Sequence, residues 1–134
     1  MKLSRTVSYA VRATLQLAES GSSVPVPCSR LAADGNMPER FLLQILRTLV
    51  TSGILRSTRG VDGGYTLHKA PDQVSLLDLI EAIEGPIQAT EPVAEGLIED
   101  AHRRLLAALD KVAKSSRDQL AAIKLSQLLR PPGE

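Results

Sequence analysis

The sequence has little cysteine and no long apolar run, and each shortage excludes a class of protein. The chain has 134 residues and a single cysteine. One cysteine can neither close an internal disulfide nor supply a thiolate-based zinc or iron–sulfur site, which excludes the disulfide-rich secreted class. No apolar run approaches the roughly 20 residues that a membrane-spanning helix needs, which excludes a transmembrane protein.

The N-terminal segment also lacks the apolar core of a secretory signal. Residues 1–6 read MKLSRT, so we expect a cytoplasmic protein without a membrane partner. The length fits one compact domain, with room for an extra helix that serves a partner. A domain of this size buries enough surface to fold without a disulfide or a metal ion.

Basic and acidic side chains nearly cancel over the whole chain but not over its two parts. The net charge is +1, from 16 Lys and Arg against 15 Asp and Glu. Residues 1–70 hold nine basic and four acidic side chains, a surplus of +5, and the remainder holds seven and eleven, which gives −4. A basic face for nucleic acid and ordinary charge scatter explain this asymmetry equally well, so motifs must decide.

Apolar periodicity predicts three helices in the first 50 residues. Apolar positions three and four residues apart indicate a helix over residues 4–19. After an extended, proline-containing segment, a short helix capped by Cys28 or Ser29 is expected to end at a left-handed Gly35. Pro38 fits the first position of a third, longer helix. This order, with a short glycine-containing turn, is typical of a helix-turn-helix.

A β-hairpin is predicted directly after the third helix. Residues 54–57 and 65–68 alternate like strands around a glycine-rich turn at 59–64. A capping box at Ser75–Asp78 then predicts a fourth helix, which Gly85–Pro86 ends. The expected fold is therefore mainly α with a small β-hairpin wing, a winged helix-turn-helix with a long C-terminal dimerisation helix.

That C-terminal helix carries a heptad seam. A second copy of the chain would supply the same seam by two-fold symmetry, although the stripe could instead fold back on its own domain. We divide the chain into a winged helix-turn-helix domain, residues 1–86, and a segment of linker, dimerisation helix and tail, residues 87–134. Ser116 is predicted to start a final helix, and residues 131–134 to form a frayed tail. The predicted dimer interface is Ile98, Ala101, Leu105, Ala108 and Val112.

Four short motifs mark the first 88 residues: Ser8–Ala13 (SYAVRA), Phe41–Leu46 (FLLQIL), Arg59–Leu67 (RGVDGGYTL) and Ile80–Gly85 (IEAIEG). Together they resemble the Rrf-type transcriptional regulators, and the C-terminal helix resembles them only loosely. The resemblance implies a bacterial homodimer that binds a palindromic operator in double-stranded DNA and pairs through its long C-terminal helix. We expect a repressor.

The residues suited to DNA lie on two helices and on the hairpin. An arginine can bind guanine or a phosphate, and a glutamine can bind adenine, so any of the polar residues of the third helix could read bases. The resemblance implies that Arg59 enters the minor groove and that Arg5 and Tyr9 touch the backbone, although Tyr9 could equally be an aromatic at the core edge. The hairpin glycines allow close approach to DNA, or simply a tight turn. The predicted DNA-binding residues are Arg5, Tyr9, Pro38, Arg40, Gln44, Arg47, Arg59, Gly60 and Gly63.

The chain departs from the family pattern in its sensing residues. Cluster-binding members carry three cysteines after the fourth helix, whereas residues 86–100 contain none, so we expect no iron–sulfur cluster and no other cofactor. Glu91, Glu95, Glu99 and His102 could bind a hard metal ion, but a solvated acidic face is the favoured interpretation. The signal could be a small ligand, an enzyme partner, as the resemblance suggests, or none.

Two further interpretations concern Cys28 and the class of activity. Cys28 could be a redox thiol if its position at a helix N-terminus lowers its pKa, or it could be a small buried filler. No serine or cysteine is paired with a recognisable base, and the two histidines are too few for a hydrolytic site, so we expect no enzyme. The alternative to a regulator is a winged-helix module that binds a protein partner.

Overall fold

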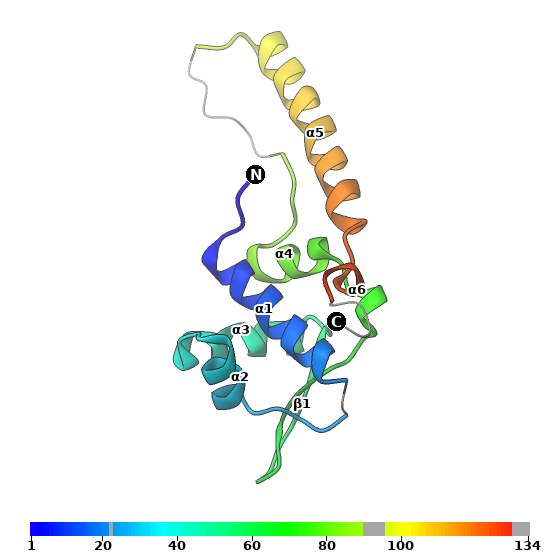
Figure 1. Ribbon diagram of the computed structural model, residues 1–134. Coiled ribbons are helices and arrows are strands. Elements are labelled where there is room, and N and C mark those ends of the chain that lie inside the picture. The colour runs from blue at the N-terminus through cyan, green and yellow to red at the C-terminus, as the bar shows by residue number, and fades with distance from the viewer. Residues whose placement is uncertain (22, 90–95, 130–134) are drawn as a thin grey trace.

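The chain, seen in a computed structural model, forms a small helical body with two projections. The structure describes residues 1–21, 23–89 and 96–129. The β1–β2 hairpin projects from one end of the body, and α5 extends beyond the other (Figure 1). In chain order the elements are α1 (Arg5–Ser20), α2 (Cys28–Gly35), α3 (Glu39–Thr51), β1 (Leu55–Thr58), β2 (Gly64–Leu67), the 3-10 turn η1 (Pro71–Gln73), α4 (Leu76–Glu84), α5 (Glu99–Ala121) and α6 (Leu125–Leu128).

The predicted helix-turn-helix is confirmed, although its helices begin and end at other residues than predicted. Pro27, rather than Cys28 or Ser29, is the N-cap of α2, and its carbonyl accepts hydrogen bonds from the N–H groups of residues 30 and 31. An extended proline can occupy this position because the N-cap contributes a carbonyl and needs no helical N–H of its own. The predicted side-chain cap was therefore wrong.

The turn between α2 and α3 also differs by one residue from the prediction. The left-handed residue is Asn36, with φ of 53°, and Gly35 remains the last residue of α2. Asparagine tolerates this conformation, so glycine is not required for the helix to end. Pro38 is the extended N-cap of α3 rather than its first residue, and Glu39 begins the helix.

The hairpin forms in the predicted place, but its first strand lies one residue later and its second strand one residue earlier than predicted. Leu55 pairs with Leu67 and Thr58 pairs with Gly64 in an antiparallel register. On the outer side of β2, Val26 exchanges both backbone hydrogen bonds with Tyr65, at 2.9 and 3.0 Å. The segment before α2 therefore pairs with the wing and fixes its base beside the helix-turn-helix.

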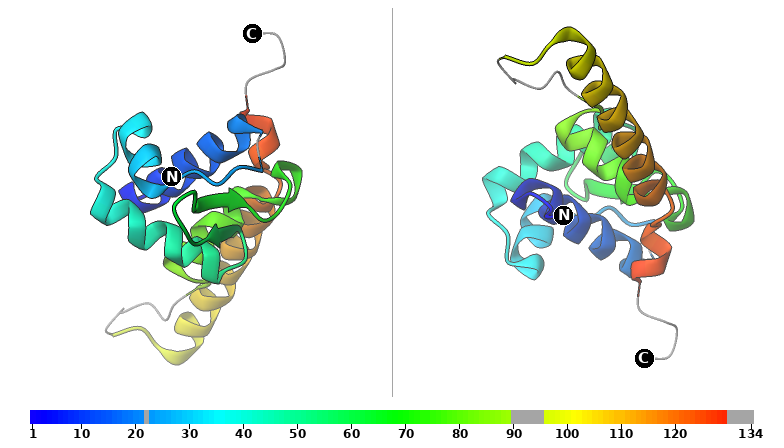
Figure 2. Two further views of the ribbon diagram at one scale, coloured as in Figure 1. Left: turned by 90° about the horizontal axis from the view of Figure 1, so that it is seen from below. Right: turned by 90° about the horizontal axis from the view of Figure 1, so that it is seen from above.

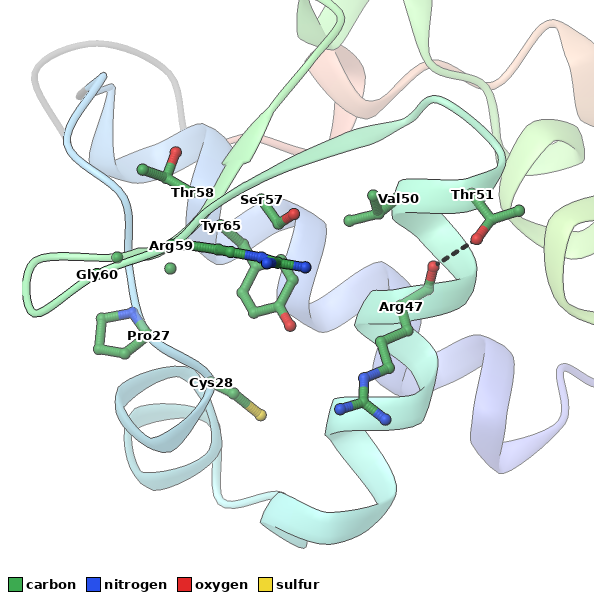
Figure 3. A pocket seen from close by; sticks show the side chains of 12 residues that line it. Pro27, Cys28, Arg47, Val50, Thr51, Ser57, Thr58, Arg59, Gly60 and Tyr65 are labelled. Atoms are coloured by element: carbon green, nitrogen blue, oxygen red, sulfur yellow. Dashed lines mark hydrogen bonds between the residues drawn. The ribbon is translucent and has the colours of Figure 1, made fainter.

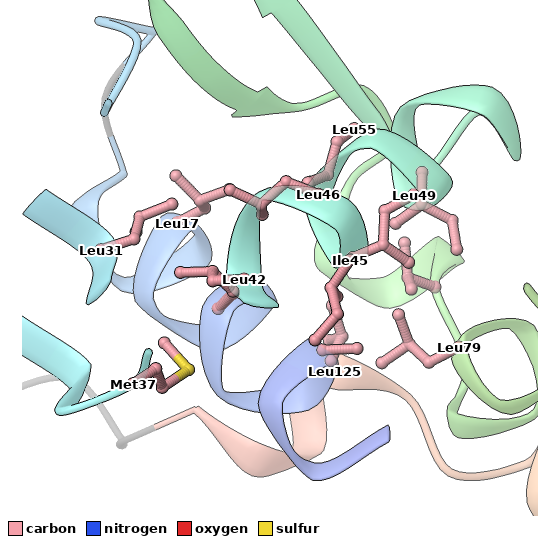
Figure 4. Close-up of a cluster of buried hydrophobic side chains, with 14 of the residues drawn as sticks. Leu17, Leu31, Met37, Leu42, Ile45, Leu46, Leu49, Leu55, Leu79 and Leu125 are labelled. Carbon is pink, nitrogen blue, oxygen red and sulfur yellow. The ribbon is translucent and has the colours of Figure 1, made fainter. Parts of the chain in front are cut away.

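One face of α3 is buried in the main core. Leu42, Leu46 and Leu49 have no solvent exposure. Around them Figure 4 shows side chains from several other elements, Leu31 of α2 and Leu79 of α4 among them. Burial of one leucine side chain contributes about 1.5–3 kcal/mol, so these contacts fix α3 and leave its opposite face free.

The capping box at the start of α4 is confirmed in full. The Ser75 hydroxyl accepts a hydrogen bond from the Asp78 N–H at 3.0 Å, and the Asp78 carboxylate accepts one from the Ser75 N–H at 2.9 Å. Gly85, with φ of 87°, ends the helix as predicted. The path of the chain into and out of α4 is therefore set by local side-chain chemistry.

The C-terminal segment returns to the body, which the periodicity did not predict. Ser116 starts no new helix, because α5 continues unbroken to Ala121. Leu120 is then buried beside α1 and α4, and Leu125 of α6 enters the main core. Backbone hydrogen bonds tie residue 123 to Leu76 and Leu125 to residue 74. In both views of Figure 2, α6 lies beside the C-terminal end of α1.

A polar contact also joins α5 to α4, about one helical turn before Leu120. Arg117 of α5 forms an ion pair with Glu81 of α4, whose carboxylate also accepts a hydrogen bond from the Ile87 N–H at 2.8 Å. The predicted linker is described only as far as residue 89, and the predicted tail, residues 131–134, lies outside the described residues. Within the described ranges, no helix is long and apolar enough to cross a membrane.

Candidate nucleic-acid interface

The free face of α3 carries the polar residues that were predicted to read DNA. Arg40, Gln44 and Arg47 are all exposed on the side opposite the buried leucines. Thr48 is exposed beside them, and its hydroxyl donates to the Gln44 carbonyl at 3.0 Å. The result is a rigid helix that presents two guanidinium groups and one amide to solvent.

A groove of about 590 Å³ separates this face from the wing. Arg47 and Thr51 of α3 form one side, and Ser57, Arg59 and Tyr65 of the hairpin form the other, as Figure 3 shows. None of the residues that line the groove is acidic. An open groove with an arginine on each side and no carboxylate is suited to an anion.

Tyr65 is the aromatic residue of this groove, and sequence reasoning used it only as part of a motif. Its backbone N–H and carbonyl both form hydrogen bonds with Val26, and it lies opposite Ser57 of β1 in the hairpin register. Burial raises the pKa of the Tyr65 hydroxyl and the nearby Cys28 raises it further, whereas Arg47 acts to lower it. The hydroxyl therefore stays protonated at neutral pH and can donate a hydrogen bond.

Two of the wing glycines are required by the hairpin itself. A Cβ atom on Gly63 would lie 2.3 Å from the Thr58 carbonyl oxygen, and one on Gly64 would lie 2.4 Å from the carbonyl carbon of Val26. Gly60 stands in open space with φ of 116°, a conformation that L-residues rarely adopt. The geometry therefore favours the tight-hairpin explanation for Gly63.

Tyr9, in the N-terminal half of α1, lies beside the first turn of α3. The Tyr9 ring is half-buried and meets Phe41 edge to face, with centroids 5.9 Å apart. The Arg12 guanidinium carbon lies 5.6 Å from the centroid of the Tyr9 ring, and this guanidinium also donates to the Gly35 carbonyl at 2.8 Å. Arg5 is exposed in the first turn of α1. Tyr9 thus connects α1 to the first turn of α3, as an aromatic at the core edge would.

Arg12 and Phe41 were not among the predicted site residues. Phe41 is 42% exposed on α3 beside Tyr9 and packs against its ring. Two sequence signals were available for Arg12: its place in the SYAVRA motif and its i+3 spacing from Tyr9, which places both residues on one face of a helix. The Gly35 carbonyl, 23 residues away, became a partner only through the fold.

Cys28 does not meet the condition set for a redox thiol. Burial raises the pKa of the thiol, and the nearby Glu39 carboxylate raises it further. Its sulfur lies 3.6 Å from the Glu39 carbonyl oxygen. A raised pKa keeps the sulfur in the less reactive thiol form, so the lowered pKa on which the redox interpretation depended is not found.

The acidic face considered for a metal ion is described only in part. Glu99 and His102 lie in the first turn of α5, whereas Glu91 and Glu95 are outside the described residues. Across residues 1–21, 23–89 and 96–129, no group of three or more His, Cys, Asp or Glu side chains could hold a metal ion. With one cysteine in the whole chain, these donors do not fit a cluster held by thiolates.

A helix-turn-helix followed by a hairpin, with arginines on both, defines a winged helix protein of the DNA-binding class. Residues 3–131 match the family described as Rrf2, iron-dependent transcriptional regulator. The chain belongs to the Rrf2 family of transcriptional regulators.

Individual relatives agree with the family match. An HTH-type transcriptional regulator of Mycobacterium tuberculosis is 38% identical over 96 residues, which span 72% of this chain and 60% of that protein. The HTH-type transcriptional regulator CymR of Bacillus subtilis is 33% identical over 91 residues, 68% of this chain and 66% of CymR. These matched segments thus span about three fifths to two thirds of the relatives' lengths.

Solved structures confirm the fold over nearly the whole chain. The structure of CymR, the global cysteine regulator of B. subtilis, superposes with a TM-score of 0.74 and 26% identity. The match covers 96% of this chain and 95% of that one. The mainly helical winged fold with its long C-terminal helix is therefore established by comparison as well as by geometry.

Proposed function

We propose that the protein is a homodimeric repressor that binds a palindromic operator. The observation that carries the proposal is the placement of Arg47 and Arg59 on opposite sides of one open groove without a carboxylate. An exposed recognition helix beside a basic wing can enter a major groove while the wing reaches the adjacent minor groove. Arg40, Gln44 and Arg47 supply base or phosphate contacts, and Arg5 supplies a backbone contact.

The homodimer is proposed from the apolar side of α5. Ile98 and Val112 are 71% and 61% exposed, and Ala108 between them is exposed as well. Two copies of this seam, packed together, would place two α3 helices on successive major grooves about 34 Å apart. We assign residues 1–86 to DNA binding and residues 87–134 to dimerisation, with Leu120 and Leu125 joining the second segment to the first.

We also propose that the protein acts without an iron–sulfur cluster, although the family is described as iron-dependent. The chain has one cysteine, and it lies in α2 rather than after α4. Thiolates are the main ligands of such clusters. A small ligand or a partner enzyme is then the class of effector to seek.

Selection of genomic DNA fragments on the purified protein, at two salt concentrations, tests this function. Recovery of an inverted repeat is the expected result, with retention that falls steeply as salt rises, because phosphate contacts release counterions. If the folded protein retains no DNA at low salt, the operator-binding function is wrong. The winged-helix module that binds a protein partner would then be the better assignment.

Arg59→Ala is expected to weaken DNA binding by about tenfold or more per protomer, because it removes the charged group at the wing that reaches the minor groove. Arg56→Ala is the matched control on the same hairpin. Arg56 lies at the stem, with its guanidinium 2.9 Å from Nδ1 of His68, and does not line the groove. Titration of a labelled operator measures both variants, and equal losses would show that Arg59 contributes only general charge.

A further inference from the structure

The two contacts proposed for DNA fix where one DNA strand must pass. A major groove and the adjacent minor groove are separated by a sugar–phosphate backbone. If α3 lies in the first groove and the wing in the second, that backbone lies between α3 and the wing. The space between them is the 590 Å³ groove that contains Tyr65.

We infer that a DNA backbone phosphate sits in the groove between α3 and the wing and accepts a hydrogen bond from the Tyr65 hydroxyl. This inference rests on the proposed function and adds a contact and a path for the DNA strand. The ligand is a phosphodiester, bound irrespective of base sequence. Tyr65 therefore contributes to affinity and to the register of the protein on DNA rather than to base readout.

The charges and hydroxyls around the groove support a phosphate. Arg47 and Arg59 approach from opposite sides, and the lining includes no carboxylate that would repel an anion. Thr51 also lines the groove, but its hydroxyl already donates to the Arg47 carbonyl at 3.1 Å. Among the described residues, none accepts a hydrogen bond from the Tyr65 hydroxyl. Tyr65, together with Ser57 and Thr58, thus supplies the hydroxyl donors that the fold leaves available in the groove, and Tyr65 is the aromatic one among them.

The backbone of Tyr65 is held in place before DNA arrives. Its backbone is paired with Ser57 on one side and with Val26 on the other. Gly64 allows this close approach, because any side chain there would collide with Val26 and Pro27. A donor that is already in place loses little conformational entropy on binding. A tyrosine hydroxyl is ordinarily protonated at neutral pH, and burial shifts the pKa of Tyr65 further upward, so this donor keeps its proton at the pH of binding.

Cys28 offers a direct test of the path, because it lines the same groove and is the single cysteine of the chain. Its alkylation by N-ethylmaleimide at mildly alkaline pH is followed by mass spectrometry, with and without a mixed-sequence DNA duplex at low salt. If the backbone fills the groove, alkylation should slow about tenfold when nine tenths of the protein is bound. The mixed-sequence duplex suffices because non-specific binding also uses phosphate contacts.

A cysteine moved to α5 is the matched control. In the double variant Cys28→Ser, Lys114→Cys, the thiol replaces an exposed side chain away from the wing and off the heptad seam. Its alkylation rate should be the same with and without DNA. If DNA binds and Cys28 still reacts at its free rate, the inferred path is wrong while DNA binding stands. If no DNA binds under any condition, the proposed function itself fails.

Tyr65→Phe tests the hydroxyl alone. We expect binding to weaken about tenfold per protomer on every sequence, with an unchanged salt slope and an unchanged Tm, because one neutral hydrogen bond to phosphate is lost. Arg47→Gln is the comparison, since loss of a phosphate-neutralising charge should lower the salt slope by about one. Full affinity in the Tyr65→Phe variant would overturn the assignment of Tyr65, even if Cys28 is protected.

Discussion

Leu125→Ala is expected to lower the free energy of unfolding by about 2–4 kcal/mol, although Leu125 lies within the last ten residues of the sequence. The side chain is 1% exposed and belongs to the same core as the buried face of α3. Figure 4 shows it below Ile45, with Leu79 nearby. Truncation to alanine removes these contacts and leaves a cavity that the surrounding helices fill only in part. Urea unfolding, with the midpoint and slope compared to the wild type, measures the loss.

The matched control is the same substitution one turn later. Leu128 also lies in α6 but is 45% exposed, so Leu128→Ala should cost well under about 1 kcal/mol. Similar small losses in both variants would show that α6 is not part of the core. A large loss for Leu125→Ala alone would show that the C-terminal segment holds the base of α5 on the body that contains α3.

The sequence predicts those features of the fold that depend on residues close together in the chain. The capping box at Ser75 and Asp78 and the end of α4 at Gly85 needed no tertiary information, and both are confirmed. The end of α2 was less certain, because Gly35 and Asn36 can each adopt the left-handed conformation that ends a helix. Helix ends shift by a residue when adjacent residues compete for the same role.

The C-terminal part was harder, because its stability comes from contacts distant in sequence. Ser116 has the chemistry of an N-cap, but serine within a helix costs little when the flanking residues favour helix, so α5 continues through it. The burial of Leu120 and Leu125 depends on α4 and the core, more than 30 residues upstream. The spacing of apolar residues within 98–129 therefore could not predict which distant residues bury Leu120 and Leu125.

The candidate interface likewise contains one part that the local sequence predicts and one part that only the folded chain creates. The polar face of α3 follows from helical spacing alone, and the structure presents Arg40, Gln44 and Arg47 together on that face. The groove joins residues 28, 47, 59 and 65, which come from α2, α3 and both sides of the wing. Strand alternation could have placed Tyr65 opposite Ser57, but only the pairing with Val26 brings its ring toward Cys28.

Ala108→Glu is expected to separate the proposed dimer and to weaken operator binding by about 10²- to 10⁴-fold. Ala108 is exposed at the middle of the seam on α5. Two-fold pairing of the seam would bring two introduced carboxylates into an apolar interface, where desolvation and mutual repulsion both oppose association. The loss in affinity follows because two linked half-site contacts become two independent ones. Sedimentation velocity measures the oligomeric state, and titration of the operator measures the affinity.

Ala107→Glu is the matched control, because it adds the same charge one residue away. Ala107 is exposed at a heptad position outside the seam, so this variant should remain dimeric and bind DNA as the wild type does. Helix content by circular dichroism should be equal in the two variants, since both substitute an exposed position of one helix. If Ala108→Glu leaves the dimer intact, the subunits do not pair through this seam. If both variants dissociate, the surface that pairs is broader than the heptad stripe, since it must then include Ala107.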